Sequence, residues 1–170
     1  MKTKTYTPIT CRLLTVNDAE AMAKIGFSFH SPHTHIDKTT AKEAVHALND
    51  WRTQCILGAF HNVGDSSHLI VAMRLCVDNE KSPIIDFDAI ESGQHEVNQL
   101  VEQSTLKLVK KILPRFKGES IMARIYLGNK ELYANRSIGV LNALIGQLKF
   151  KLTYGNRDQA GFGFILDRSA

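Results

Sequence analysis

The segment PIIDFDAI, residues 83–90, decides the fold because it is a short strand-like run that leads into a long helical pattern. Its apolar residues partly alternate with Asp86 and Asp88, which predicts a strand with both carboxylates on one face. After residues 91–95, apolar side chains recur at helical spacing as far as Pro114 and predict one long amphipathic helix. That apolar stripe consists of Val97, Leu100, Val101, Ser104, Leu108 and Ile112.

The same pattern then repeats. Residues 119–127 predict a strand, and residues 137–148 predict a second amphipathic helix. Its apolar stripe consists of Ile138, Leu141, Leu144, Ile145 and Leu148. The order strand, helix, strand, helix implies a parallel strand pair joined by a helical crossover. The long helix begins with backbone N–H groups that lack intrahelical partners, so its junction with the preceding strand suits an anion such as a pyrophosphate.

The rest of the chain supplies further strands and helices. Asn17 and Glu20 fit the cap of a first helix. The other expected strands are residues 9–14, 55–60, 68–77, 150–154 and 162–166, and the other expected helices are residues 19–25 and 44–51. This order predicts an α/β fold with a mixed sheet of about seven strands, antiparallel in its N-terminal part, with a central parallel pair and helices on both faces. We expect ligands where the two parallel strands splay, beyond their carboxyl ends.

Composition limits the class of protein. The chain has 170 residues, 44% of them apolar and 22% charged, which fits one domain spanning residues 1–170. No apolar run is long enough to span a bilayer, and the basic residues 1–6 precede no apolar signal core, so we expect a cytoplasmic protein that binds no membrane. Cys11, Cys55 and Cys76 lack CxxC spacing and fit buried packing in a reducing compartment. The net charge of +4 suits an anionic ligand but does not indicate nucleic acid.

The order of these elements resembles the GNAT superfamily of N-acetyltransferases, whose central unit is the same strand, loop, helix, strand and helix. Residues 141–150, LNALIGQLKF, are similar to the family's helix that ends in Leu-Gly-Phe before a final hairpin, with Lys149 where glycine is usual. The family's pyrophosphate loop carries Gln or Arg, two residues, Gly, one residue, then Gly or Ala. Residues 94–99, QHEVNQ, keep the Gln and lack both small residues.

The resemblance implies an enzyme that transfers an acyl group directly from acetyl-CoA or another acyl-CoA to a small-molecule amine. The backbone amides that would hold the pyrophosphate belong to Gly93, Gln94, His95, Glu96, Val97 and Asn98. Gly93 is the residue free to take unusual dihedral angles. The alternative is that these residues form only a polar turn that caps a helix. Asn129 follows the second strand where the family has an Asn near the cofactor, with Asn135 as a competing match.

Carboxylates at the end of the first strand are candidates for the general base. Glu91 is preferred by its position near the expected splay. Asp86 and Asp88 share a face and can raise each other's pKa, or they can form a solvated strand face.

A general acid is harder to place. The family often has a Tyr in its last core helix at the position of Ile145, and an Ile cannot donate a proton. Tyr133, between the second strand and the second helix, can replace it or can anchor a long loop.

Three other features have simpler explanations. His30, His33, His35 and Asp37 match no zinc spacing, so we expect a polar loop near the acceptor and no metal site. Gly139 and Gly146 fall on nearly one helix face and suggest tight packing. The basic end of the long helix complements the helix dipole.

Two alternatives to the acetyltransferase remain. One is a catalytically inactive protein of the GNAT fold that binds a metabolite or a protein. The other is an acyltransferase that takes longer acyl chains from a carrier protein. The sequence also leaves room for a homodimer.

Overall fold

The computed structural model describes residues 8–25, 54–77, 83–90, 94–128, 138–158 and 161–169. The strands are β1 (Ile9–Leu13), β2 (Gln54–Val63), β3 (Ser66–Cys76), β4 (Ile84–Ala89), β5 (Ile121–Gly128), β6 (Lys151–Asp158) and β7 (Gly161–Arg168). The helical elements are the 3-10 turn η1 (Val16–Asp18), α1 (Ala19–Lys24), α3 (His95–Ile112), the 3-10 turn η2 (Leu113–Phe116) and the π-helical η3 (Asn142–Gln147), which residues 138–141 enter as an α-helix.

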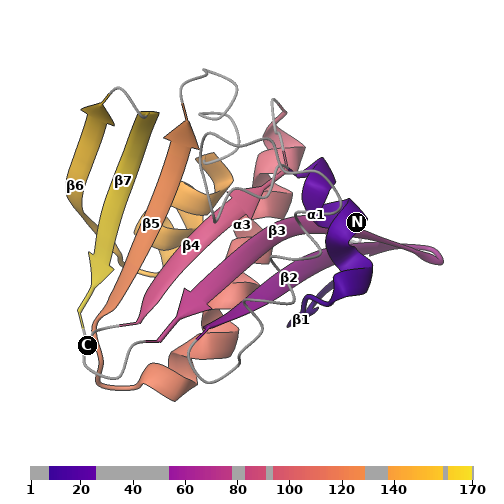
Figure 1. Cartoon of the computed structure of the whole chain (residues 1–170), viewed down its shortest axis with the longest axis horizontal. Helices are drawn as coiled ribbons and strands as arrows, with labels where there is room; N and C mark the ends of the chain where they lie inside the picture. The colour runs from indigo at the N-terminus through magenta and orange to yellow at the C-terminus, as the bar shows by residue number, and fades with distance from the viewer. Residues whose placement is uncertain are drawn as a thin grey trace, which may run out of the picture.

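Within these described ranges, the strands form one seven-stranded sheet in the order β1-β2-β3-β4-β5-β7-β6 (Figure 1). Neighbouring strands are antiparallel except β4 and β5, which are parallel. The helix α3 lies between these two strands in the chain. Parallel neighbours need such a crossover, since a tight hairpin turn joins only antiparallel strands. The mixed sheet and its central parallel pair are therefore confirmed.

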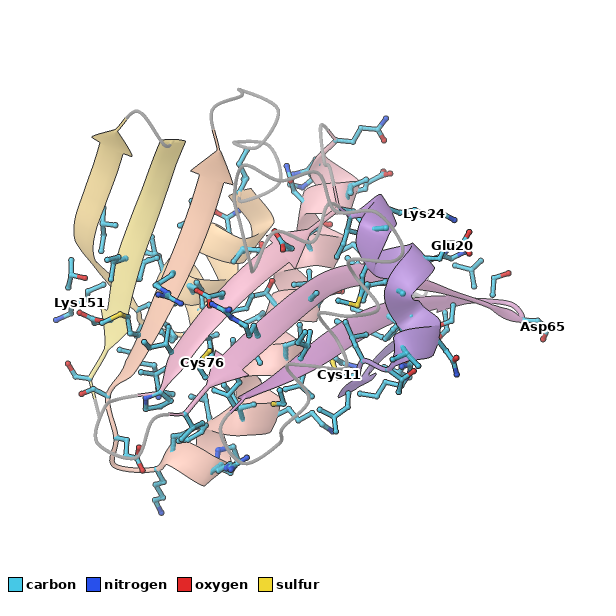
Figure 2. The ribbon with its side chains drawn as sticks, in the orientation of Figure 1. Cys11, Glu20, Lys24, Asp65, Cys76 and Lys151 are labelled. Carbon is cyan, nitrogen blue, oxygen red and sulfur yellow. The ribbon has the colours of Figure 1, made fainter. Side chains whose placement is uncertain are left out.

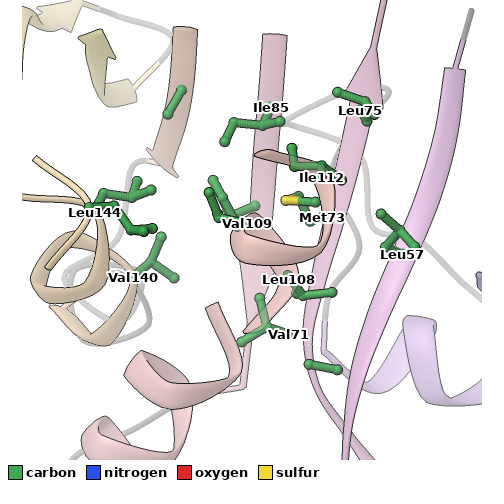
Figure 3. Close-up of a cluster of buried hydrophobic side chains, with 14 of the residues drawn as sticks. Leu57, Val71, Met73, Leu75, Ile85, Leu108, Val109, Ile112, Val140 and Leu144 are labelled. Atoms are coloured by element: carbon green, nitrogen blue, oxygen red, sulfur yellow. The ribbon is translucent and has the colours of Figure 1, made fainter. Parts of the chain in front are cut away.

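Helices cover both faces of the sheet, as predicted. The side chains of α3 pack against one face together with those of residues 140–148, and Figure 3 shows this core between the helices and the strands. The short α1 packs on the other face through Met22, against Ile56 and Phe60 of β2. Strand β4 alternates as predicted, with Ile85, Phe87 and Ala89 buried and Asp86 and Asp88 on the opposite face.

The apolar stripe of α3 is also confirmed. Val101, Ser104, Leu108 and Ile112 are buried, and Val97 and Leu100 are partly buried. Leu108, Val109 and Ile112 face the strands in Figure 3. Among the described helices, none is long and apolar enough to cross a membrane.

The last helix differs from the predicted amphipathic helix. Its final turn is π-helical, and the N–H of Leu148 donates to the carbonyl of Ala143, five residues earlier, over 3.0 Å. The wider turn rotates residues relative to an α-helical stripe, so Ile145 is 46% exposed instead of buried. Ile138, at the start of the stripe, is 41% exposed.

The two glycines of this helix have different environments. A Cβ at Gly139 would lie 2.7 Å from the backbone oxygen of Asn98 and 2.7 Å from the Cβ of Val101, so tight packing is confirmed there. A Cβ at Gly146 would meet nothing within 4 Å, so tight packing is wrong for that position. Lys149, which stands where the family has glycine, has φ of 63°, a left-handed conformation that glycine adopts more readily.

The β2–β3 hairpin is longer than predicted. Its strands continue to a register pair between Val63 and Ser66, so only Gly64 and Asp65 form the turn. Gly64 has φ of 57°, as a two-residue hairpin turn requires. Figure 2 shows Asp65 at the tip of this hairpin, away from the body of the sheet. The expected helix 44–51 lies outside the described residues.

The cap before α1 is not the predicted pair of Asn17 and Glu20. Thr15 and Asp18 form a capping box at the start of η1 instead, and Asp18 makes no side-chain cap to α1. The carboxylate of Asp18 accepts hydrogen bonds from both terminal nitrogens of Arg12, over 2.8 and 2.9 Å, and from the N–H of Thr15 over 2.8 Å. The guanidinium of Arg12 also lies 4.1 Å from the ring centroid of Phe60. These contacts join β1, η1 and β2. The sequence pattern that indicates this capping box is the spacing of Thr15 and Asp18, with Arg12 near the end of the preceding strand.

This cluster predicts a pH-dependent contribution to stability. Burial raises the pKa of Asp18, but the hydrogen bonds from Arg12 and Thr15 outweigh burial, so the pKa lies below its ordinary value. A folded-state pKa below the unfolded value means that the stabilisation is present above the unfolded pKa of about 3.9 and is lost as pH falls below it. We expect Asp18→Asn to lower the free energy of unfolding by about 1–2 kcal/mol at pH 7, and by less as the pH approaches 3, in urea titrations.

The matched control is Asp65→Asn at the exposed hairpin tip, which should change the free energy of unfolding by less than about 0.5 kcal/mol. A loss for Asp18→Asn that stayed constant down to pH 3 would contradict this account.

Candidate active site

The parallel strands β4 and β5 pair only at their beginnings. Ile84 pairs with Met122, Ile85 with Ala123, and Asp86 with Arg124, and within the two described strands the register ends there. Strand β4 nevertheless continues to Ala89 and β5 to Gly128. Each keeps its outer neighbour, because Ala89 still pairs with Val71 of β3 and Gly128 with Phe162 of β7. The two strands therefore diverge toward their carboxyl ends, as expected (Figure 1), and we call the Asp86–Arg124 pair the divergence point.

The divergence leaves a backbone donor on β4. The N–H of Ile90 donates to the carbonyl of Ile70 over 3.0 Å, so it points toward β3. Successive N–H groups of a strand point to opposite sides, so the N–H of Ala89 points to the β5 side. Since the described register between β4 and β5 ends at Asp86, this N–H faces the space between the diverging strands.

The N-terminus of α3 supplies a second set of backbone donors. The N–H of Asn98 donates to the carbonyl of Gln94 over 3.0 Å, and the amides of residues 95–97 precede this first helical bond. Gln94 makes no side-chain cap, and Gln94, His95 and Glu96 are exposed. The helix dipole adds positive potential at these amides, which suits an anion. The carboxylate of Glu96 in the same turn repels an anion.

The predicted site residues fall into two groups. Gln94, His95, Glu96, Val97 and Asn98 lie in the first turn of α3 or at its cap. The N–H of Asn98 already donates to Gln94, so Asn98 does not offer a backbone donor to a pyrophosphate. The others lie outside the described residues, namely Glu91, Gly93, Asn129 and Tyr133, together with the histidine-rich segment 30–37.

A cluster of charged residues at the divergence point was missed. Arg74 of β3, Asp86 of β4 and Arg124 of β5 occupy one row across three neighbouring strands. Arg74 donates through Nε to Oδ2 of Asp86 over 2.9 Å and also through Nη2, while Arg124 donates through Nε to Oδ1 over 2.8 Å and through Nη2 to Oδ2 over 3.0 Å. The Asp86 side chain is only 13% exposed, so its interpretation as a solvated strand face is wrong.

In the sequence, this cluster is indicated by single charged residues that lie within otherwise apolar strands. Arg74 and Arg124 each interrupt a run that is otherwise apolar, in the sequences AMRLC and MARIY. A buried charge needs a partner, and opposite charges on three strands satisfy one another. The hydrogen bonds to Asp86 raise the pKa of Arg124, so this guanidinium stays charged at every pH of interest. The register that brings the three together was not readable from the sequence.

Burial disfavours the thiolate form of all three cysteines. Cys76 lies on the central part of the sheet in Figure 2, near Arg74 and Asp86, and burial raises the pKa of its thiol. Burial also raises the pKa of Cys11 and of Cys55. Thiolates are the reactive form, and these thiols stay protonated. In the part of the chain that the structure describes, no three His, Cys, Asp or Glu residues gather to hold a metal ion.

Comparisons with known proteins find a match for the fold but none for the sequence. No protein-family model matches the sequence, and no curated protein matches it. Solved structures do match: a ribosomal-protein-S5-alanine acetyltransferase from Vibrio fischeri shares 10% identity with a TM-score of 0.64, over 95% of this chain and 92% of that one. The aminoglycoside acetyltransferase AAC(6')-Ib in complex with coenzyme A shares 14% identity with a TM-score of 0.60, over 95% of each chain.

A third match is an apo nucleotide-linked sugar GNAT, at 11% identity with a TM-score of 0.55, over 96% of this chain and 87% of that one. Identities this low carry information about the fold alone. The strand order, the parallel pair and the two helical layers agree with that likeness. The chain therefore has the fold of the GNAT superfamily of N-acetyltransferases.

Proposed function

We propose that this protein transfers an acetyl group, or another acyl group, from an acyl-CoA directly to a small-molecule amine. The observation that carries the proposal is the parting of β4 and β5 beside the N-terminus of α3. It places backbone donors of two elements at the carboxyl ends of parallel strands, where open sheets bind ligands. Support also comes from the fold, since several matching structures are acetyltransferases and one is a complex with coenzyme A.

The amides at the start of α3 suit the pyrophosphate of CoA. Among the described residues they belong to residues 95–97, since the N–H of Asn98 already donates to Gln94, and a helix N-terminus binds phosphate through such groups. Glycines are absent from residues 94–99, so the amides of the helix itself, not a glycine-rich loop, supply the contacts in this proposal. The N–H of Ala89 suits the thioester oxygen, because a fixed donor stabilises the negative charge that develops there during acyl transfer.

The reaction that we propose needs one base and one acid. The amine nitrogen forms a bond to the thioester carbonyl carbon, and the carbon–sulfur bond breaks. Glu91, just beyond the end of β4, takes the proton that the amine loses. Tyr133 gives a proton to the departing thiolate of CoA. Ile145, at the position of the family's Tyr, is exposed and has no proton to give.

A second candidate is a binding protein of the same fold without catalysis. Two observations favour it: Ile145 stands in place of a proton donor, and Glu96 places a negative charge in the first turn of α3. This candidate predicts binding of CoA or of another metabolite without turnover.

Titration calorimetry with acetyl-CoA and with CoA tests the proposal. We expect a dissociation constant below about 1 mM for both, and release of free thiol when a mixture of amines is added. Longer acyl-CoA thioesters in the same assay decide the acyl length. Binding without thiol release would favour the binding protein, and the absence of binding at millimolar ligand would contradict the proposal.

Removing the charge of Glu96 should strengthen the binding of CoA. A charge at an exposed helix end contributes about 0.3–1 kcal/mol, so we expect Glu96→Gln to lower the dissociation constant of CoA by about two- to fivefold in calorimetry at low salt. High salt should reduce the difference, because it screens exposed charges.

The control for this change is Glu119→Gln, which removes an exposed carboxylate just before β5, at the opposite end of α3. It should leave the affinity for CoA unchanged. Equal effects of the two substitutions would indicate a response to net charge and would remove α3 as the phosphate site.

A further inference from the structure

The charged row at the divergence point holds Arg124 in a fixed orientation. Asp86 pairs in register with Arg74 on one side and with Arg124 on the other. Arg74 is 14% exposed, whereas Arg124 is 43% exposed. Arg124 is therefore the member of the row that a ligand can reach. It lies on the same face of the sheet as Asp86, opposite α3.

The hydrogen bonds of Arg124 leave one edge of its guanidinium available. Asp86 accepts from Nε over 2.8 Å and from Nη2 over 3.0 Å. A guanidinium has five N–H donors, so three remain, two on Nη1 and one on Nη2. Among the described residues, no hydrogen bond of Arg124 uses Nη1. The edge between Nη1 and Nη2 has the fork geometry that binds a carboxylate through two parallel hydrogen bonds.

The charges around this edge have both signs. The row of Arg74, Asp86 and Arg124 has two positive charges and one negative charge, a net charge of +1. Asp88 follows on the same face of β4, beyond the last residue that pairs with β5. The net positive charge of the row favours a ligand that brings a negative group, such as a carboxylate, to Arg124.

We propose that the edge of Arg124 formed by Nη1 and Nη2 binds a carboxylate of the acceptor, so that the acceptor is an amine that also carries a carboxylate, as amino acids do. This inference rests on the proposed function. Asp86 is a positioning residue here, because it orients Arg124 through the other edge of the guanidinium. The substrate class follows from Arg124 alone and not from the residues that hold CoA.

The test compares matched acceptors. Acetyl-CoA-dependent thiol release is measured with the common amino acids and with the corresponding amino-acid amides, which keep the amine and lose the carboxylate. Wild type is compared with Arg124→Gln, with Arg124→Lys, which keeps the charge and loses the fork, and with the control Arg115→Gln. Arg115 is an exposed arginine of η2, at the opposite end of α3.

We expect kcat/KM for amino acids to exceed that for their amides by at least about tenfold in wild type and in Arg115→Gln. In Arg124→Gln, KM for amino acids should rise by about tenfold or more, while KM for acetyl-CoA and turnover of the amides stay unchanged. Tm should fall, because Asp86 keeps Arg74 but loses its second partner. The KM of Arg124→Lys for amino acids should lie between the values for wild type and for Arg124→Gln. Equal use of acids and amides by wild type, or an equal loss with both in Arg124→Gln, would overturn the proposal, because a merely structural row affects both alike.

A second measurement separates this inference from the proposed function. Ligand-observed NMR detects binding of the same amino acids and amides to the full chain without turnover. If calorimetry finds no binding of acetyl-CoA, the proposed function fails. Binding of amino acids but not of amides, lost in Arg124→Gln and kept in Arg115→Gln, would still support the carboxylate site. Absence of any carboxylate-dependent binding to wild type would overturn it.

Discussion

The pairing between β4 and β5 stops at Asp86 and Arg124, although both strands continue and keep their outer neighbours. A sheet that loses a ladder in its middle must leave backbone groups without strand partners, and buried backbone groups need partners. The N–H of Ala89 is such a group. The crossover helix α3 begins close in sequence to the end of β4, so its unpaired amides belong to the same edge of the sheet. The arrangement of donors, and with it the proposed chemistry, follows from this one interruption.

The core and the charged row keep the interruption in place. Ile85 and Phe87 bury their side chains against α3, while Asp86 on the other face joins Arg74 and Arg124 across three strands. Removing one member of such a buried group costs more than the pair contributes, because the remaining charge loses its partner. The row also holds Arg124 at the last paired position of the β4–β5 ladder, where it is partly exposed.

The sequence predicted the fold well because its signals were local and periodic. The stripe from Val97 to Ile112 and the alternation in residues 83–90 specified the long helix, the strand and the faces that they bury. Errors arose where the surrounding structure decides: Asp18, which Arg12 also binds, joins Thr15 in the capping box of η1, and Ile145 lies exposed in the π-helical turn. For the site, the sequence placed the amides of α3 but missed the row of Arg74, Asp86 and Arg124. That row depends on strand register, which side-chain periodicity alone does not specify.

Amide hydrogen exchange at Ala89, measured by NMR in the free protein and with acetyl-CoA, tests the divergence of β4 and β5 most directly. The reference is Asp88, which precedes Ala89 in β4 and pairs with Ala72 of β3. The structure predicts faster exchange at Ala89 than at Asp88 in the free protein, and slower exchange at Ala89 when acetyl-CoA is present. Equal protection of the two amides in the free protein would mean that β5 closes against β4 along its whole length, and it would contradict the account.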